Sequence, residues 1–344
     1  MKPYALNPAC DRIQIRLHYV RKQSATLEIW EKNNLETLLE FPSEGKLTHN
    51  WEITGLKPGT TYEYGRKGRG REGSFRTLPE KGKVRVAVFG DPQGHCHLQS
   101  VTSAVAKYKP DLAVCLGDNA DKADPLLYGE FFRKTRRLLN RCALISTPGN
   151  HDYESCSPPF NGKNPISQIY KNWFGDEKLN CTALVTGSYK LLAIAFPDRN
   201  SLTEKCRKWL LKELESARKH RQKVLLFHHC PCFTSTTITW ALDAETLPLL
   251  LEEYKDTVLA DFAGHIHTYE FSKYPDDKGV WYVTTGGAGE LYNFPVKSVN
   301  NPYEKSSADV YHSLLLDLAP GKMVMRVIGE DGKILEEHKY NWSR

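Results

Sequence analysis

Polar and apolar residues alternate in short stretches through most of residues 1–78. The segments 13–20, 24–30 and 61–66 are rich in β-branched and aromatic residues, and 47–56 continues the pattern. Such segments favour strands with one buried face. We expect a short polar turn between the first two segments, and turn chemistry recurs at Pro58-Gly59-Thr60. Short strands at this spacing predict a small β-sandwich over residues 1–78.

Beyond a polar linker at 77–83 the pattern changes, because apolar runs now alternate with segments of helical spacing. The expected strands are 84–90, 111–117, 143–147, 189–196, 223–229 and 257–263, with a β-rich tail from 280. The expected helices are 98–109, 131–140, 202–219 and a segment near 244–255. This alternation predicts a layered α/β domain over residues 83–344, with much of its sheet parallel.

Composition narrows the class of protein without naming a function. The chain has 344 residues, 40% of them hydrophobic and 26% charged, which excludes a disordered chain and fits two domains. No apolar run approaches the ~20 residues of a membrane helix. The net charge is +6, and the densest basic stretch is GRKGRGR at 65–71. This segment lacks the aromatic residues that single-strand binding uses. We therefore interpret it as a solvated hairpin tip and do not expect nucleic acid as a partner.

The cysteines and the first residues of the chain are relevant to the cellular compartment of the protein. Nine Cys are too few for a disulfide scaffold, and Cys115 and Cys142 lie in apolar runs where buried thiols are expected. The pairing of the others does not follow from sequence. The opening MKPYALNP lacks the apolar segment of a signal peptide. Two alternatives stay open: a cytoplasmic protein, or a secreted or periplasmic one from which a leader has been removed.

Five short segments with chemically active side chains each follow an expected strand. They are FGDPQG (89–94), LGDNAD (116–121), PGNHDYE (148–154), FHHCP (227–231) and AGHIHTYE (263–270). Loops at the carboxyl ends of strands form the site in open α/β sheets, so these segments can converge on one cleft. Carboxylates, an Asn and several His suit Zn, Fe or Mn. Two such cations ~3.5–4 Å apart would hold a hydroxide and clamp a phosphate.

The residue spacing supports a shared site. His265 and His267 are two positions apart, so both rings can point the same way. Asp91 and Asp118 each follow a Gly at a strand end, and one central carboxylate can bridge two cations. Taken singly, a Gly-Asp pair is usually a turn, a His pair usually packs in a core, and Asn150-His151-Asp152 can be a helix N-cap. The ordered set of five favours a metal site.

Taken in their order along the chain, the five segments resemble the signature of the calcineurin-like metallophosphoesterases, which is D, GD, GNH(D/E), H and GHxH. GHIHTYE and the N-terminal β-module are similar to the purple-acid-phosphatase-like branch, because GLKPGTTYEY and SFRTLP resemble late strands of a fibronectin type III domain. The resemblance implies two metal ions. It assigns Asp91 and His267 to the first ion, Asp118 to a bridge, and Asn150, His229 and His265 to the second.

The same resemblance implies roles for three more residues. His151 would lie beside the substrate phosphate and protonate the leaving alkoxide or stabilise charge on the phosphoryl oxygens. Asp152 would orient His151 by accepting from its other ring nitrogen, with a surface carboxylate as the alternative. His228 would pack beneath the site, since the ligand in this family usually stands in His-x-Pro, which is His229 here.

The sequence departs from the branch at the first metal. Purple acid phosphatases place an iron-binding Tyr where this chain has Asp121, and other members place a His where it has Gln93. Asp121 or the Gln93 amide oxygen would complete the first site, or each would have a structural role. Tyr128, seven residues beyond Asp121, is a poor substitute. Without that Tyr the protein is not expected to be purple.

These observations predict a dinuclear-metal hydrolase of phosphate esters that acts through a metal-bound hydroxide. The expected reaction is phosphomonoester hydrolysis on a small-molecule substrate. A phosphodiesterase acting on nucleotide-type or other diesters is the first alternative. A non-catalytic metal-binding or adhesion protein is the second.

Overall fold

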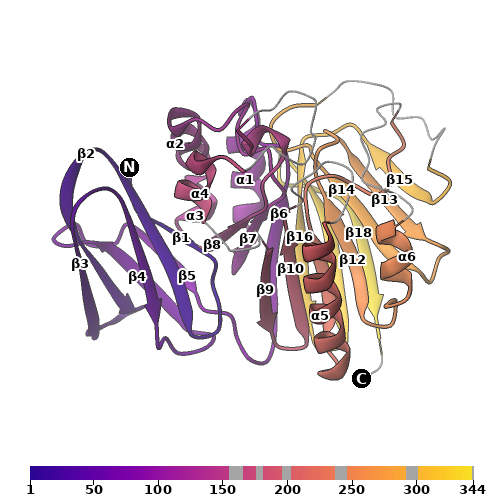
Figure 1. Cartoon of the computed structure of the whole chain (residues 1–344), viewed down its shortest axis with the longest axis horizontal. Coiled ribbons are helices and arrows are strands. Elements are labelled where there is room, and N and C mark those ends of the chain that lie inside the picture. Colours follow the sequence, from indigo (N-terminus) through magenta and orange to yellow (C-terminus); the bar gives the residue numbers. More distant parts are fainter. Residues whose placement is uncertain (155–165, 176–180, 196–202, 237–245, 292–300, 343–344) are drawn as a thin grey trace.

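Two β-sheets pack face to face, and helices cover both outer faces (Figure 1). This computed structural model describes residues 1–154, 166–175, 181–195, 203–236, 246–291 and 301–342. A core between the sheets includes Val86, Val88, Phe227 and Phe262. The expected layered α/β domain is confirmed. Its strands divide between two sheets rather than one.

The first sheet carries three parallel strands in its middle. These are β6 (Val84–Phe89), β7 (Leu112–Cys115) and β8 (Ala143–Ser146). The antiparallel strands β16 (His312–Ala319), β17 (Lys322–Gly329) and β18 (Ile334–Asn341) extend it beyond β6. Because β6, β7 and β8 run in the same direction, the loops that follow them leave the same edge of the sheet.

The second sheet has the order β15-β13-β14-β12-β11-β10-β9. Its parallel strands are β10 (Tyr189–Ile194), β11 (Lys223–Phe227), β12 (Val258–Ala263) and β14 (Val280–Thr285). The antiparallel strands are β9 (Cys181–Thr186), β13 (Tyr269–Tyr274) and β15 (Glu304–Ala308). The loops after β11 and β12 therefore also leave a common edge.

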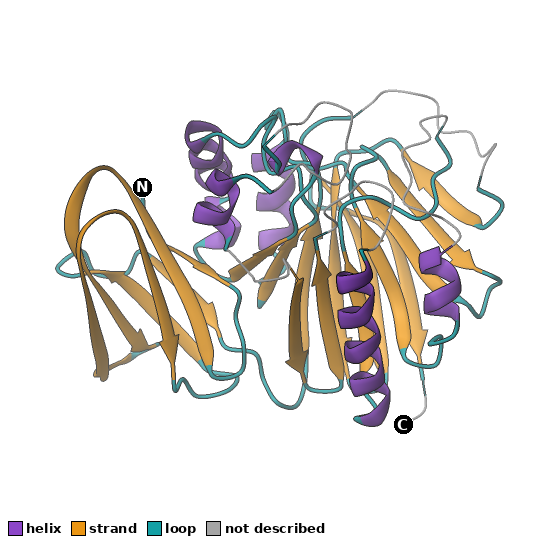
Figure 2. Ribbon diagram, viewed as in Figure 1, coloured by secondary structure: helices purple, strands orange, loops and turns teal. Residues whose placement is uncertain are grey.

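Each outer face has its own helices (Figure 2). The first sheet is covered by α1 (Leu98–Ala106), α2 (Pro125–Lys134), α3 (Arg136–Leu139) and α4 (Gln168–Phe174), and the second by α5 (Glu204–Lys219) and α6 (Thr246–Glu252). Among the described residues, none of the helices combines the length and apolar composition needed to cross a bilayer. Cys115 and Cys142 are buried as expected.

The single helix expected at 131–140 is wrong, because the structure has two helices there. The first, α2, begins six residues earlier, where Asp124 Oδ1 accepts from the backbone N–H of Leu126 at 2.8 Å and of Leu127 at 3.3 Å. Pro125 occupies the first helical position, where its missing N–H costs nothing. The Thr135 hydroxyl donates to the Phe131 carbonyl at 2.8 Å and marks the break before α3.

The N-terminal residues form strands only, as expected. They are β1 (Tyr4–Leu6), β2 (Arg12–Glu31), β3 (Asn34–Thr54), β4 (Thr61–Arg66) and β5 (Gly73–Arg76), around a core that includes Ile15, Ile29, Trp51 and Phe75. The expected turn between 20 and 24 is wrong. There β2 continues as a ribbon with β3, and the pairing shifts between His18 and Gln23. Both faces of the ribbon are exposed at 20–24, so polar residues there need no turn.

The N-terminal strands are continuous with the first sheet. Leu6 of β1 pairs with Leu144 of β8, in parallel. Tyr4 and Leu6 are buried in the core that lies under α1–α4. The boundary between residues 1–78 and 83–344 stays a prediction. The structure adds that the two parts share a sheet and a core.

The basic segment 65–71 lies at the turn between β4 and β5. Three of its cations form ion pairs: Arg66 with Glu72 at 2.6 Å, Lys67 with Glu40 at 2.8 Å, and Arg71 with Glu63 at 3.4 Å. Neighbouring carboxylates therefore neutralise much of the segment locally. This agrees with the interpretation as a solvated hairpin tip.

Arg16 connects the N-terminal strands to α4. Its side chain is buried, and Nη1 donates to the last carbonyls of α4, Lys171 O at 2.6 Å and Asn172 O at 2.7 Å. We expect Arg16→Ala to lower the free energy of unfolding by about 2 kcal/mol, because two carbonyls at the end of α4 lose a charged donor that is itself buried. Denaturant unfolding measures this change. Arg12→Ala, at an exposed position of β2, is the control and should have little effect. Equal effects of the two substitutions would contradict the connection.

Candidate metal centre

The six predicted ligands converge at one end of the molecule. Three of them follow strands of the first sheet: Asp91 after β6, Asp118 after β7 and Asn150 after β8. The other three follow strands of the second sheet, His229 after β11 and His265 and His267 after β12. The two sheets are joined here by the backbone N–H of His265, which donates to Asp91 Oδ2 at 2.7 Å. The site therefore lies across the carboxyl edges of both sheets.

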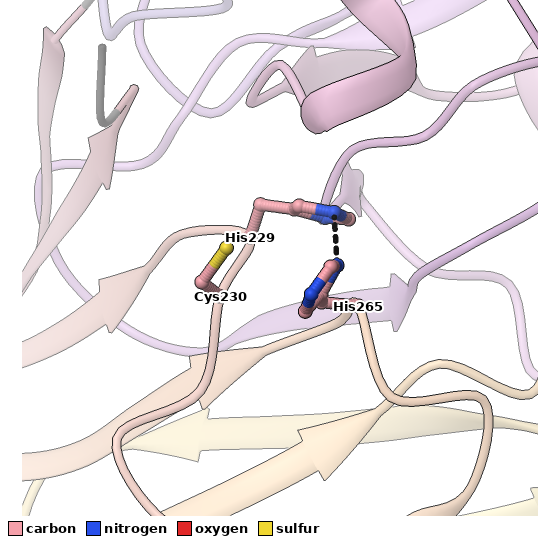
Figure 3. A group of neighbouring side chains, drawn as sticks. All are labelled: His229, Cys230 and His265. Carbon is pink, nitrogen blue, oxygen red and sulfur yellow. Dashed lines mark hydrogen bonds between the residues drawn. The ribbon is translucent and has the colours of Figure 1, made fainter. Parts of the chain in front are cut away.

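Three of the other five side chains surround His229. Its Nε2 lies 3.0 Å from Asn150 Oδ1, 3.3 Å from Asp118 Oδ2 and 3.2 Å from His265 Nδ1. Figure 3 shows the His229 and His265 rings meeting through these nitrogens. The other nitrogen of His229, Nδ1, is 2.7 Å from the Leu116 carbonyl. That carbonyl fixes the ring so that Nε2 faces the centre.

The other two predicted ligands, Asp91 and His267, lie next to the side chains around His229. His267 Nε2 is 3.6 Å from Asp91 Oδ1 and 3.2 Å from Gln93 Nε2. Gln93 is 7% exposed, so its amide is buried beside His267. Asp121 is exposed, and its Oδ1 accepts from the backbone N–H of Gly94 at 3.1 Å. Of the two residues considered for the first metal, Gln93 is the one that touches a predicted ligand.

Three of the six residues have left-handed backbone conformations. The φ angles are 56° at Asp91, 52° at Asp118 and 67° at His265. Such angles are uncommon outside glycine and cost of order 1–3 kcal/mol each. Backbone strain of this kind concentrates at functional sites, where the surrounding structure holds it in place. Its presence at three predicted ligands is an independent sign of function.

Two glycines let the backbone approach the carboxylates. A Cβ on Gly149 would come 2.1 Å from Asp118 Oδ1, and one on Gly264 would come 2.4 Å from Asp91 Oδ2. Real Cβ atoms do not come that close, so a side chain at either position would displace a carboxylate. These residues explain why a Gly stands in both GNHD and GHIH.

The charges in the centre are strongly coupled. Burial, and then the charge of Asp118, raise the pKa of Asp91 well above its usual range. Burial also opposes ionisation of Asp118, but the charge and hydrogen bond of His229 outweigh it and hold the pKa of Asp118 below its usual range. The same pairing raises the pKa of His229 to about 9 despite burial, whereas burial lowers the pKa of His267 to about 4. Two buried carboxylates side by side are costly without cations.

These residues fit bound cations. Asp91 Oδ1 is buried and accepts no hydrogen bond from the described residues. One donor atom from each of Asp91, Asp118 and His229 lies within 4.8 Å of the other two, and the same holds for His229, Cys230 and His265. Mixed oxygen and imidazole donors suit Zn, Fe and Mn. Because both groups include His229, the donors form one continuous centre.

His151 has a different partner from the expected one. Its Nδ1 lies 2.7 Å from the backbone carbonyl of Asp121, whereas the expected bond was to the Asp152 carboxylate. Its Nε2 is 3.9 Å from Asp118 Oδ2, so this nitrogen faces the centre. The expected role of Asp152 as the acceptor for His151 is therefore corrected. The backbone carbonyl of Asp121 is the acceptor for the His151 ring instead.

Asp152 instead joins the two loops that carry Asp118 and Asn150. It is completely buried and accepts from Gly149 N at 2.9 Å, Asn119 Nδ2 at 3.1 Å and the Tyr128 hydroxyl at 2.7 Å. The alternative of a surface carboxylate is also wrong. Burial, and then the charge of Asp118, raise the pKa of Asp152 to about 6.

Sequence reasoning missed three residues of the centre. Tyr128 and Asn119 hold Asp152, and although Asn119 stands in the segment LGDNAD, nothing in the sequence linked either residue to Asp152. Cys230 is buried next to His229 and His265 (Figure 3). Its place directly after the ligand His229 was the one available signal. A thiolate here would suit Zn or Fe.

Comparisons with known proteins agree with this geometry. The sequence profile of the Calcineurin-like phosphoesterase family matches residues 84–269. "Purple acid phosphatase 21" of Arabidopsis thaliana is 29% identical over an alignment of 266 residues that covers 72% of this chain and 60% of that protein. The chain thus spans less than two thirds of the length of this relative.

Two solved structures are similar in fold. The purple acid phosphatase PPD1 from seeds of yellow lupin (Lupinus luteus) has a TM-score of 0.81 at 15% identity, over 98% of this chain and 74% of that one. A structure of PhoD has a TM-score of 0.78 at 12% identity, over 99% of this chain and 88% of that one. Because both similarities include nearly all of this chain, they extend to the N-terminal strands.

Proposed function

Because this chain belongs to the calcineurin-like phosphoesterase family, we propose that it is a metal-dependent hydrolase of phosphomonoesters. The observation that carries the proposal is the convergence of six donors from two sheets on one buried centre, with strained backbone at three of them. The similarity to proteins named purple acid phosphatases supports the monoester over the diester. The proposed substrate is a small phosphate ester.

Two divalent cations would occupy the centre. Asp91 and His267 would hold the first, Asp118 would lie between both, and the second would be held by Asn150, His229 and His265. Gln93 is proposed to complete the first position through its amide oxygen Oε1, which is buried and has no hydrogen-bond partner among the described residues. The nitrogen of the same amide lies 3.2 Å from His267 Nε2, whereas Asp121 is exposed and bound to Gly94. When bound, the cations would supply Lewis acidity toward the phosphoryl oxygens and would lower the pKa of water.

His151 would supply the proton that the leaving group needs. The Asp121 carbonyl accepts from Nδ1–H, which leaves Nε2 to gain or release a proton on the side of Asp118. The backbone N–H of His151 donates to Asp118 Oδ1 at 2.9 Å, so ring and carboxylate keep a fixed relation. A positioned imidazole of this kind contributes about 10²–10⁴-fold to a proton-transfer step.

One assay panel tests the proposal. The protein is loaded separately with Zn, Mn or Fe, and hydrolysis of an aryl phosphate monoester is compared with that of the matching diester. Metal content is measured on the same samples. We expect faster monoester turnover with at least one of the metals. Faster diester turnover would contradict the substrate class, and bound metal without turnover of either ester would contradict an enzyme.

A further inference from the structure

A second group of metal-type donors lies in the core of the second sheet, at the carboxyl end of β11. It consists of His228, Cys232 and Asp261, which are 0%, 1% and 1% exposed. The surrounding core belongs to the second sheet and is covered by α5 and α6 (Figure 2). Sequence analysis placed His228 beneath the site without giving it a chemical role.

The three side chains come from neighbouring strands, and His228 and Cys232 both contact the Asp261 carboxylate. His228 and Cys232 follow β11, and Asp261 is in the adjoining β12. His228 Nε2 is 2.6 Å from Asp261 Oδ1, and Cys232 Sγ is 3.7 Å from Asp261 Oδ2. One donor atom from each of the three lies within 4.8 Å of the other two. Imidazole, thiolate and carboxylate are the ligands that Zn²⁺ binds in proteins.

A fourth polar group adjoins these three. Tyr282 of β14 is paired in register with Asp261, and its side chain is 4% exposed. Within the described part of the chain its hydroxyl has no hydrogen-bond partner. Burial, and then the charges of Cys232 and Asp261, raise the pKa of Tyr282 well above its usual value. A buried hydroxyl without a partner costs about 1–3 kcal/mol, so its presence needs an explanation.

We propose that His228, Cys232 and Asp261 bind a structural Zn²⁺ ion, with the Tyr282 hydroxyl as the nearest further donor. Structural zinc sites use four donors and are closed to substrate. Complete burial excludes the other chemistry of a Cys-His-Asp set, which is nucleophilic catalysis, because no substrate reaches the thiol. A thiolate with an imidazole selects zinc over magnesium or calcium.

The proposed ion has a consequence for the neighbouring centre. His228 and His229 are consecutive residues whose rings lie in the two different groups. An ion that joins β11 to β12 through His228 and Asp261 would fix the backbone from which His229 projects. The zinc would therefore act as a positioning element and would take no part in the reaction.

Cobalt substitution tests the site through a signal unrelated to activity. The apoprotein is loaded with Co²⁺, and the thiolate-to-cobalt absorption band and the bound metal are measured. We expect Cys232→Ser to lose the band and one metal equivalent. Both this variant and its control are made in a Cys230→Ser background, because the Cys230 thiol adjoins the first centre and would contribute a thiolate band of its own. Cys142→Ser, at another buried thiol, should keep the band. Retention of the band in Cys232→Ser would overturn the proposal.

Two further variants keep the test decisive if Cys232→Ser does not fold. Tyr282→Phe keeps the packing, and we expect it to weaken binding of this one ion by about 10–100-fold, as loss of a supporting group does. Asp118→Asn disables the first centre only, so it should retain one equivalent of Co²⁺ and the full band. An Asp118→Asn protein without metal or band would refute the zinc site, whatever the outcome of the phosphatase assays.

Discussion

Asp118→Asn is expected to remove metal from both positions of the centre and to reduce kcat/KM by about 10³-fold or more. Asp118 lies between the two groups of donors, 3.3 Å from His229 Nε2, and its charge acts on Asp91. Cations contribute several kcal/mol of charge stabilisation, and each ~1.4 kcal/mol is a factor of ten in rate. Asn tolerates the φ of 52° at this position better than Ala does, so the fold should be retained. Metal analysis and steady-state kinetics measure both effects.

Asp111→Asn is the matched control. Asp111 stands just before β7, at the opposite end of the strand from Asp118, and pairs with Arg76 at 3.1 Å. This variant loses a partly exposed ion pair and should keep full metal content and turnover. An Asp118→Asn protein that keeps both metals of this centre and reacts at the normal rate would remove Asp118 from the bridge.

His151→Ala is expected to lower turnover by about 10²–10⁴-fold on esters with poor leaving groups, with metal content nearly unchanged. The loss should be much smaller on an activated aryl phosphate, because its leaving group departs with little need for a proton. The geometry supports this role: Nδ1 is held by the Asp121 carbonyl, and Nε2 faces the centre. The comparison requires kcat for a series of leaving groups with wild type and variant.

His97→Ala provides the control, since His97 is half-exposed, paired with Glu330 at 2.8 Å, and no part of the centre. It should leave turnover unchanged on both kinds of ester. An equal loss on good and poor leaving groups in His151→Ala would argue against proton donation. Loss of metal would instead make His151 a ligand.

The sequence allowed the convergence of the six donors to be predicted, because one physical rule governs them. Apolar runs marked the strands, and polar motifs such as GD and GHIH followed them directly. Parallel strands bring such ends to a common edge. The same rule does not say which strands share a sheet. The strands β7 and β12 are both buried along their whole length, so their sequences do not show that they lie in different layers.

The partner of His151 was beyond sequence reasoning for another reason. Side-chain acceptors can be recognised by residue type, whereas any residue supplies a backbone carbonyl. The bond to Asp121 O depends on loop conformation, and so does the burial of Asp152 under Tyr128. The continuous ribbon of β2 was missed in a similar way. Its polar residues at 20–24 suit a turn and an exposed ribbon equally well.

Because Asp91, Asp118 and His265 have left-handed conformations, a substitution that stabilises the fold at these positions can abolish activity. Glycine relieves such strain, so replacing Asp91 by Gly would remove both a costly backbone angle and a buried carboxylate whose ionisation is opposed by burial and by the charge of Asp118. The metal-free protein would become harder to unfold while losing its centre. A screen of random variants for heat resistance alone would therefore enrich inactive molecules at these positions, and engineering of this protein needs a selection that measures turnover as well.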